Sequence, residues 1–159
     1  MILAIDPGIE KVGYAFFEKK GKDFSFITSG LIKTKKTTLH EVRLLGIYNH
    51  LASMIQQYKP SLLVMEQLFF FKNQKTVVSV AQAQGVIQLL SAQNRLPISY
   101  LTPLVIKQTI TGYGNADKKA VLKMLKLTLK SDLVVEDDDQ SDAIACGLAY
   151  CYLNRNLLG

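Results

Sequence analysis

The sequence is poor in the residue types that build disulfide frameworks and zinc sites. Its 159 residues include only two cysteines and two histidines. Cys146 and Cys151 lie five apart in one apolar segment and would face different sides of a helix, so we expect buried free thiols. His40 and His50 are ten apart in a segment with a helical pattern, and they predict no zinc site.

Long apolar runs are missing too. No uninterrupted run approaches the ~18 residues of a membrane span, and the first residues, MILAIDPG, lack the basic flank and long apolar stretch of a signal peptide. We therefore expect a cytoplasmic protein with no membrane partner. The chain is nevertheless 48% hydrophobic, with only four prolines and ten glycines. This composition argues against disorder and predicts one domain over residues 1–159 with a single core.

Acidic residues are scarce in most of the chain and concentrated near its end. Residues 1–130 hold 18 Lys and Arg against seven Asp and Glu, a net charge of +11, whereas residues 131–159 hold one Arg against six acids, a net charge of −5. A basic body favours a polyanion as partner, with nucleic acid the first candidate. The acidic block predicts either a solvated loop or a place where metal ions bind.

The order of the predicted elements is that of an α/β protein with a five-stranded mixed sheet flanked by helices. We expect three antiparallel strands, followed by two parallel strands, with the fourth strand beside the first. The strands are expected at Ile2–Asp6, Val12–Phe17, Phe24–Ile32, Ser61–Met65 and Ile98–Leu101, and the helices at Thr38–Tyr58, Lys75–Asn94, a short stretch ending at Gly112, Ala116–Lys130 and Ser141–Leu153.

Two carboxylates end strands in this arrangement. Asp6 follows an apolar strand and precedes Pro7-Gly8, and Glu66 follows the wholly apolar Leu62–Met65. Parallel neighbours would place both side chains at the carboxyl ends of the strands, where open α/β sheets bind ligands. Asp6 alone is also explained as a turn residue, but a Glu at the end of a buried strand is hard to explain by packing.

A second pair of carboxylates lies at the start of the closing helix. Asp139 and Asp142 are three apart, so they project from one helix face, although this spacing also suits a capping box. The small residues in 143–149 would let the helix approach the sheet and press Asp142 against the strand ends. We expect the neighbouring Asp137 and Asp138 to be solvated loop charges.

Four converging carboxylates would repel one another unless cations lay between them. All-oxygen ligands suit Mg²⁺ or Mn²⁺, and two such ions ~4 Å apart can clamp a phosphodiester and activate water for its hydrolysis. We therefore expect two ions per site. Their expected ligands are Asp6, Glu66, Asp139 and Asp142.

Five ordered motifs, spread from Met1 to about Tyr152, resemble the RuvC family of Holliday junction resolvases. They are Ile5-Asp6-Pro7-Gly8 with Gly13-Tyr14, Met65-Glu66-Gln67-Leu68-Phe69 with Lys72-Asn73, Gln82-Ala83-Gln84-Gly85, Val105-Ile106-Lys107-Gln108-Thr109 with Gly112 and Gly114, and Asp139-x-x-Asp142-Ala143. The resemblance implies an RNase H-like fold and a homodimeric, magnesium-dependent endonuclease. Such enzymes cut opposed strands of a four-way DNA junction in recombination and repair, and a branch-migration helicase complex is a further expected partner.

The resemblance also implies roles for individual residues. The four carboxylates match the family's metal ligands, although Asp138 could substitute for Asp139 through a one-residue shift. Phe69 matches an aromatic residue that works at the junction centre, and Lys107 and Lys118 match basic residues near the cut strand. The full set of expected DNA-binding residues is Phe69, Lys72, Lys107, Lys118 and Lys119.

Three surface features have two explanations each. The lysines at 119, 123, 126 and 130 form one helical stripe, which suits a solvated face as well as phosphate contact. Of the three aromatics at 69–71, at least one should be exposed and able to stack on an unpaired base, while others join the core. The helix of Lys75–Asn94 carries small residues that would cover the sheet or allow a two-fold contact with a second copy.

Other functions stay open on the sequence alone. A nuclease of the related YqgF type would act on RNA, and a junction-binding protein would have lost catalysis. The segment Asp6-Pro7-Gly8, followed by Gly13, also resembles the phosphate loop of actin-like ATPases, but those proteins need two such domains. The motif around Glu66 and the pair of Asp139 and Asp142 favour a RuvC-type nuclease.

Overall fold

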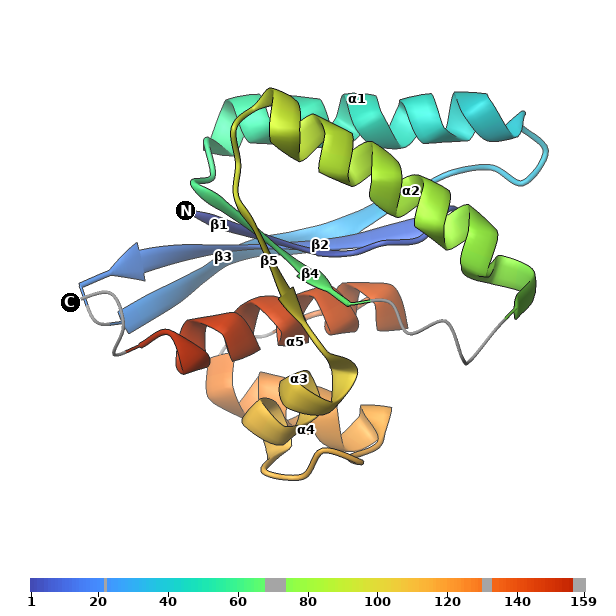
Figure 1. Ribbon diagram of the computed structural model, residues 1–159. Coiled ribbons are helices and arrows are strands. Elements are labelled where there is room, and N and C mark those ends of the chain that lie inside the picture. The colour runs from blue at the N-terminus through green and yellow to red at the C-terminus, as the bar shows by residue number, and fades with distance from the viewer. Residues whose placement is uncertain (22, 68–73, 130–132, 156–159) are drawn as a thin grey trace.

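A central sheet organises the molecule (Figure 1). The computed structural model describes residues 1–21, 23–67, 74–129 and 133–155. Within these residues, five strands form one sheet in the order β3-β2-β1-β4-β5. The strands are β1 (Ile2–Asp6), β2 (Lys11–Lys20), β3 (Asp23–Lys33), β4 (Leu62–Glu66) and β5 (Ile98–Leu101). The first three are antiparallel and β4 lies parallel to β1, which confirms the predicted topology.

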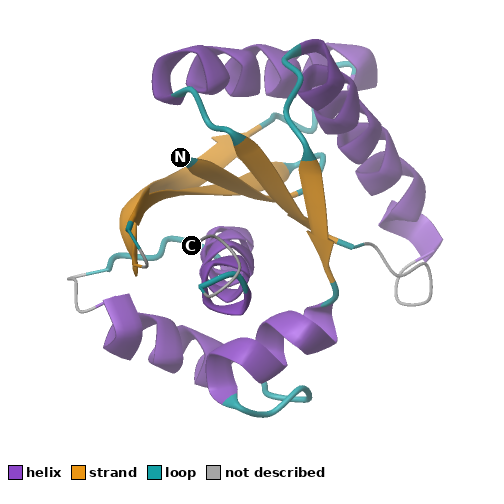
Figure 2. Ribbon diagram, turned by 60° about the vertical axis from the view of Figure 1, so that its left-hand side comes forward, coloured by secondary structure: helices purple, strands orange, loops and turns teal. Residues whose placement is uncertain are grey.

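Helices cover both faces of the sheet. In the described part of the chain they are α1 (His40–Tyr58), α2 (Gln74–Gln93), α3 (Pro103–Thr111), α4 (Lys118–Leu129) and α5 (Asp138–Leu153). Helices α1 and α2 pack on one face, while α5 packs on the other with α3 and α4 beyond it (Figure 2). None of these helices is long and apolar enough to cross a membrane.

The strand β4 is buried on both sides, as its apolar sequence predicts. Leu63 and Met65 belong to the core layer under α1 and α2, whereas Val64 belongs to the layer under α5. Alternate side chains therefore enter opposite layers, which is how a central parallel strand is covered in α/β proteins. The charged Glu66 follows directly where these layers end.

Small residues let α5 lie close against the sheet. A Cβ atom at Gly147 would lie only 2.4 Å from the Phe17 ring and 2.9 Å from the Cβ of Ala4. The closeness that the small residues predicted is confirmed, and α5 is buried along most of its length. Cys146 and Cys151 are buried free thiols in this helix, again as expected.

The start of α5 differs from the sequence-based expectation. The helix begins at Asp138, three residues before the expected Ser141, because Asp137 is its N-cap. The Asp137 carboxylate accepts a hydrogen bond from the Asp139 N–H at 3.3 Å. The interpretation of Asp137 and Asp138 as loop charges is therefore wrong, since one caps the helix and the other is its first residue.

Candidate active site

Two carboxylates lie at one edge of the sheet. β1 and β4 are parallel neighbours in which Ile5 pairs with Met65, so Asp6 and Glu66 follow at the same end of adjacent strands. Burial raises the pKa of Asp6 well above its usual range, and the negative charges of Asp142, Glu66 and Asp139 add to this effect. The structure thus places Asp6 within the electrostatic reach of all three other predicted ligands.

The first turns of α5 bring the second pair to the same place. Burial raises the pKa of Asp139, and the charge of Asp137 raises it further. Burial also raises the pKa of Asp142, against an opposing effect from Lys118. Asp138 is different because its side chain is 70% exposed and pairs with Lys118. The geometry therefore favours Asp139 over Asp138 as the member of the cluster.

A glycine in β2 allows this approach. A Cβ atom at Gly13 would lie 1.9 Å from the carbonyl oxygen of Asp139. No side chain larger than hydrogen fits in that space, so the backbone of the first turn of α5 rests directly on β2. Gly13 thereby contributes to placing Asp139 near the strand ends, a role that its motif alone did not disclose.

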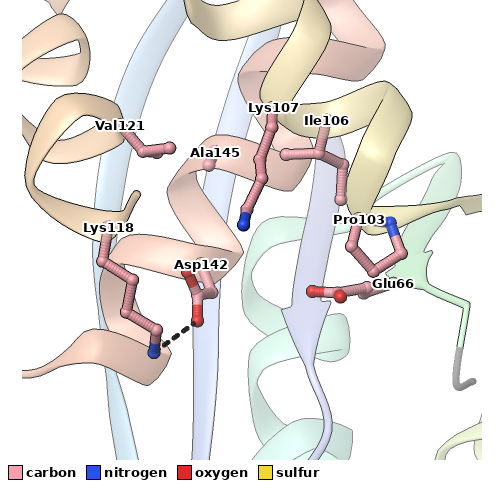
Figure 3. Close-up of a pocket in the computed structure, with 8 residues that line it drawn as sticks. All are labelled: Glu66, Pro103, Ile106, Lys107, Lys118, Val121, Asp142 and Ala145. Carbon is pink, nitrogen blue, oxygen red and sulfur yellow. Dashed lines mark hydrogen bonds and ion pairs between the residues drawn. The ribbon is translucent and has the colours of Figure 1, made fainter. Parts of the chain in front are cut away.

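Two lysines lie beside the carboxylates. Glu66, Lys107, Lys118 and Asp142 line a hollow of about 220 Å³, and Lys107 extends into the space between Glu66 and Asp142 (Figure 3). Lys118 Nζ lies 3.4 Å from Asp142 Oδ2 and 3.1 Å from Asp138 Oδ2. Burial disfavours the charged form of Lys118, but Asp142 and Asp138 outweigh it and raise the pKa of this lysine.

The ends of α3 and α4 determine the positions of Lys107 and Lys118. Thr102 caps α3 by accepting a hydrogen bond from the Val105 N–H at 3.2 Å, and α3 ends at Gly112 in the left-handed conformation. Lys107 lies in the middle of this short helix. Asp117 Oδ1 accepts a hydrogen bond from the Ala120 N–H at 2.8 Å, so α4 begins at Lys118, facing the start of α5.

Further hollows flank the carboxylates. One of about 210 Å³ is lined by Lys118, Lys119 and the acidic residues at 136–138 and 142. Another of about 330 Å³ lies beside Asp6 and Asp139 and reaches Lys11. The predicted Lys119 therefore lies next to the cluster but outside the hollow that holds Lys107.

Several predicted residues cannot be placed. Phe69 and Lys72 lie outside the described residues, as does Lys130 of the lysine stripe.

His40 and His50 lie on α1, on the face of the sheet opposite α5. Sequence reasoning overlooked Lys11, which pairs with Asp137 across 126 residues of chain. No spacing rule signals a partner so far away.

The chemistry of the four carboxylates suits a hard divalent cation. The candidate ligands are carboxylate oxygens only, which suits Mg²⁺ or Mn²⁺. Among the described residues, however, no group of three or more Asp, Glu, His or Cys side chains is arranged to hold an ion. The carboxylates lie near enough to raise the pKa of Asp6, and a cation between them would relieve that repulsion.

The fold is of the RNase H-like class. A solved structure described as Thermus thermophilus RuvC aligns with a TM-score of 0.84 at 23% identity, covering 97% of this chain and 95% of that one. A second, of T. thermophilus RuvC in complex with a Holliday junction substrate, aligns with a TM-score of 0.88 at 22% identity, covering 97% and 94%. At these identities, the likeness shows the fold.

Sequence comparison gives the family. The family model described as crossover junction endodeoxyribonuclease RuvC matches residues 2–151. The RuvC of Caldicellulosiruptor saccharolyticus is 41% identical over 158 residues, 99% of this chain and 95% of that protein. The RuvC of Thermosipho melanesiensis is 43% identical over 150 residues, 94% of each. The chain belongs to the RuvC family, as its motifs indicated.

Proposed function

We propose that the protein is a homodimeric, magnesium-dependent endonuclease of the cytoplasm that resolves four-way DNA junctions by paired symmetric nicks. One observation carries the proposal. Four carboxylates from β1, β4 and α5 act on one another electrostatically beside two lysines, in a protein with a net charge of +6. Membership of the RuvC family supports the junction as substrate, since the relatives are named crossover junction endodeoxyribonucleases.

The four carboxylates would hold the metal ions. Asp6 and Glu66 approach from the strand ends, and Asp139 and Asp142 approach from α5. Magnesium bound there would polarise the phosphodiester and lower the pKa of the attacking water. Asp6 is partly buried, and the lower dielectric around a partly buried carboxylate strengthens its interaction with a cation.

The lysines would act on the phosphate. Lys107 extends towards Glu66 and Asp142 (Figure 3), and a charged amine there would stabilise negative charge that develops on the phosphate during cleavage. Lys118 is held by Asp138 and Asp142 in the free protein. A DNA phosphate brought to the site would give it a further anionic partner. We assign Phe69 and Lys72 to the junction as well, on the family motif alone.

Helix α2 supports the dimer. Val78 and Leu89 are 64% and 57% exposed, and Ala81, Gln82 and Gly85 between them are exposed too. These residues recur at helical spacing, so they form one face, and its small members allow a second helix to approach closely. A second copy with this face against its own would carry two identical sites, one for each opposed strand.

A labelled four-way junction tests the activity. The protein is incubated with it and Mg²⁺, and we expect paired symmetric nicks that ligase can seal. Structured RNA serves as the competing substrate, and preferential cleavage of RNA would favour a YqgF-type activity instead. Binding of the junction without any cleavage would identify a non-catalytic binding protein.

Analytical ultracentrifugation tests the dimer. We expect a dimer for the wild type and a monomer for Leu89→Glu, because a charge in a close helix contact is costly. A monomeric wild type would remove the dimer from the proposal. A pull-down with a branch-migration helicase tests the remaining partner.

A further inference from the structure

The N-cap of α5 is shared between two interactions. Oδ1 of Asp137 accepts the hydrogen bond from the Asp139 N–H at 3.3 Å, while Oδ2 accepts a hydrogen bond from Lys11 Nζ. Lys11 is the first residue of β2. One carboxylate therefore connects the edge of the sheet to the backbone of a candidate metal ligand.

From this we infer that Lys11 is a positioning residue for Asp139. By fixing the Asp137 carboxylate, Lys11 sets the capping geometry of α5 and thereby the place from which Asp139 reaches a metal ion. The inference rests on the proposed function for the metal ion only. Residues that orient metal ligands typically change metal affinity about 10- to 100-fold when they are lost.

The other contacts of this helix end do not reach Asp139 by a side chain. Gln140 Nε2 donates to Ser29 Oγ at 2.9 Å, and Gln140 Oε1 accepts from the Glu136 N–H at 2.9 Å. The first bond ties the first turn of α5 to β3, and the second ties Gln140 to the residue before the N-cap. Among the described residues, the Asp139 N–H donates its side-chain hydrogen bond to Asp137 Oδ1.

A neighbouring ion pair provides a matched control. Lys33 of β3 is the register partner of Lys11, and it pairs with Glu136 at 3.4 Å, with side chains 60% and 67% exposed. The Lys11 and Asp137 side chains are only 40% and 23% exposed. Exposed pairs contribute little, and Glu136 makes no capping bond to a candidate ligand.

The sign of the effect separates positioning from charge. Removing a positive charge beside carboxylates should, by electrostatics alone, tighten the binding of a cation. Loss of positioning should weaken it. Lys11→Met and Lys33→Met each remove one positive charge from adjacent strand ends, and the charge of Lys11 also acts directly on Asp139. Weaker binding by Lys11→Met than by Lys33→Met therefore reports the capping link, because the loss of charge alone would tighten binding.

Calorimetric titration of metal-free protein with Mn²⁺ is the test. We expect Lys11→Met to raise the dissociation constant about tenfold, Lys33→Met to leave it unchanged or lower it, and Lys11→Arg to restore most of the affinity. In an Asp137→Asn background, which keeps a capping oxygen, Lys11→Met should have no further effect. Unchanged or tighter Mn²⁺ binding by Lys11→Met would overturn the inference.

Amide hydrogen exchange of the metal-free proteins gives a second measurement. We expect faster exchange at the Asp139 N–H in Lys11→Met than in Lys33→Met, with circular dichroism confirming that both are folded. Equal exchange would also overturn the inference. If the wild type binds no Mn²⁺ while exchange still differs, the proposed metal function fails and the positioning role stands.

Discussion

The two halves of the carboxylate cluster are held in different ways. Asp6 and Glu66 are the last residues of β1 and β4, and each of these strands has a hydrogen-bonded neighbour on both sides. The ladder continues past Glu66, where the Gln67 N–H donates to the Leu101 carbonyl at 2.8 Å. Asp139 and Asp142 depend on where a helix begins. The strand-borne half is fixed by backbone bonds, and the helix-borne half by side chains and a glycine.

The halves also differ in charge compensation. Asp142 has Lys118 beside it, which opposes the rise of its pKa. For Asp6, the lowering effect of Lys118 is the smallest of the five that act on its pKa. Asp6, which the sheet fixes in space, thus gains more from a cation than Asp142, which Lys118 already partly neutralises.

The largest loss of junction cleavage should come from a substitution in the strand-borne half. Asp6→Asn should abolish junction cleavage, because it removes a ligand that the sheet holds in place, while junction binding is retained or slightly tighter since a charge near phosphate is gone. Gel-shift and cleavage assays on one junction measure both. Asp23→Asn, at an exposed ion pair with Arg155, is the matched control and should cut normally. Near wild-type cleavage by Asp6→Asn would contradict the metal assignment.

Cleavage should also be slowed when a side chain at position 13 keeps the start of α5, with Asp139, away from β2. Gly13→Ala places a methyl group where the Asp139 carbonyl now lies, so α5 must shift. A misplacement of ~1 Å can lower a rate about 10²-fold, and overpacking costs about 1–3 kcal/mol of stability. Single-turnover cleavage and thermal unfolding measure the two effects.

A glycine with free space around it is the control for this substitution. Gly46 in α1 has no atom within 4 Å of a built Cβ, so Gly46→Ala should leave cleavage unchanged and raise stability by about 0.5–1 kcal/mol. Equal behaviour of the two variants would show that the contact at Gly13 does not position the site.

The same contrast explains what could be predicted from the sequence. Strand periodicity and the apolar run before Glu66 were enough to place β1 beside β4, and hence Asp6 beside Glu66. The start of α5 was misplaced because Asp137 caps it three residues earlier than expected, and Asp137 also pairs with Lys11, far away in the chain. Such pairs leave no local pattern, so the sequence predicted which carboxylates lie near one another but not the contacts that orient them.

Metal-free stability should depend on pH through Asp6. Its pKa is raised in the folded state, so the folded state holds more protons than the unfolded state between the two pKa values. Stability therefore falls as pH rises from the unfolded value, about 3.9, through the folded one. Asp6→Asn removes the contribution of Asp6 to this dependence, whereas Asp139 and Asp142, whose pKa values are also raised, keep theirs. The Tm advantage of Asp6→Asn over the wild type should therefore grow with pH. Differential scanning fluorimetry measures this, at about 2–4 °C for each kcal/mol.

Added Mg²⁺ provides the control for the pH series. A cation stabilises the ionised carboxylates of the wild type but loses a ligand in Asp6→Asn, so the Tm advantage of the variant should shrink or reverse. An advantage that is independent of pH and of Mg²⁺ would show that Asp6 is not the group responsible.

The smallest effect on cleavage should come from substitution of a lysine that lies away from both halves of the carboxylate cluster. Lys118 pairs with Asp142, whereas Lys123 is exposed further along α4. Lys118→Ala should lower the single-turnover rate more than junction affinity. Lys123→Ala should leave the rate unchanged and reduce the slope of log affinity against log salt by about one for one lost phosphate contact. Junction affinity measured over a series of salt concentrations, together with single-turnover rates at saturating protein, distinguishes the two variants. Matching losses in both variants would mean that proximity to the helix-borne carboxylates gives Lys118 no special role.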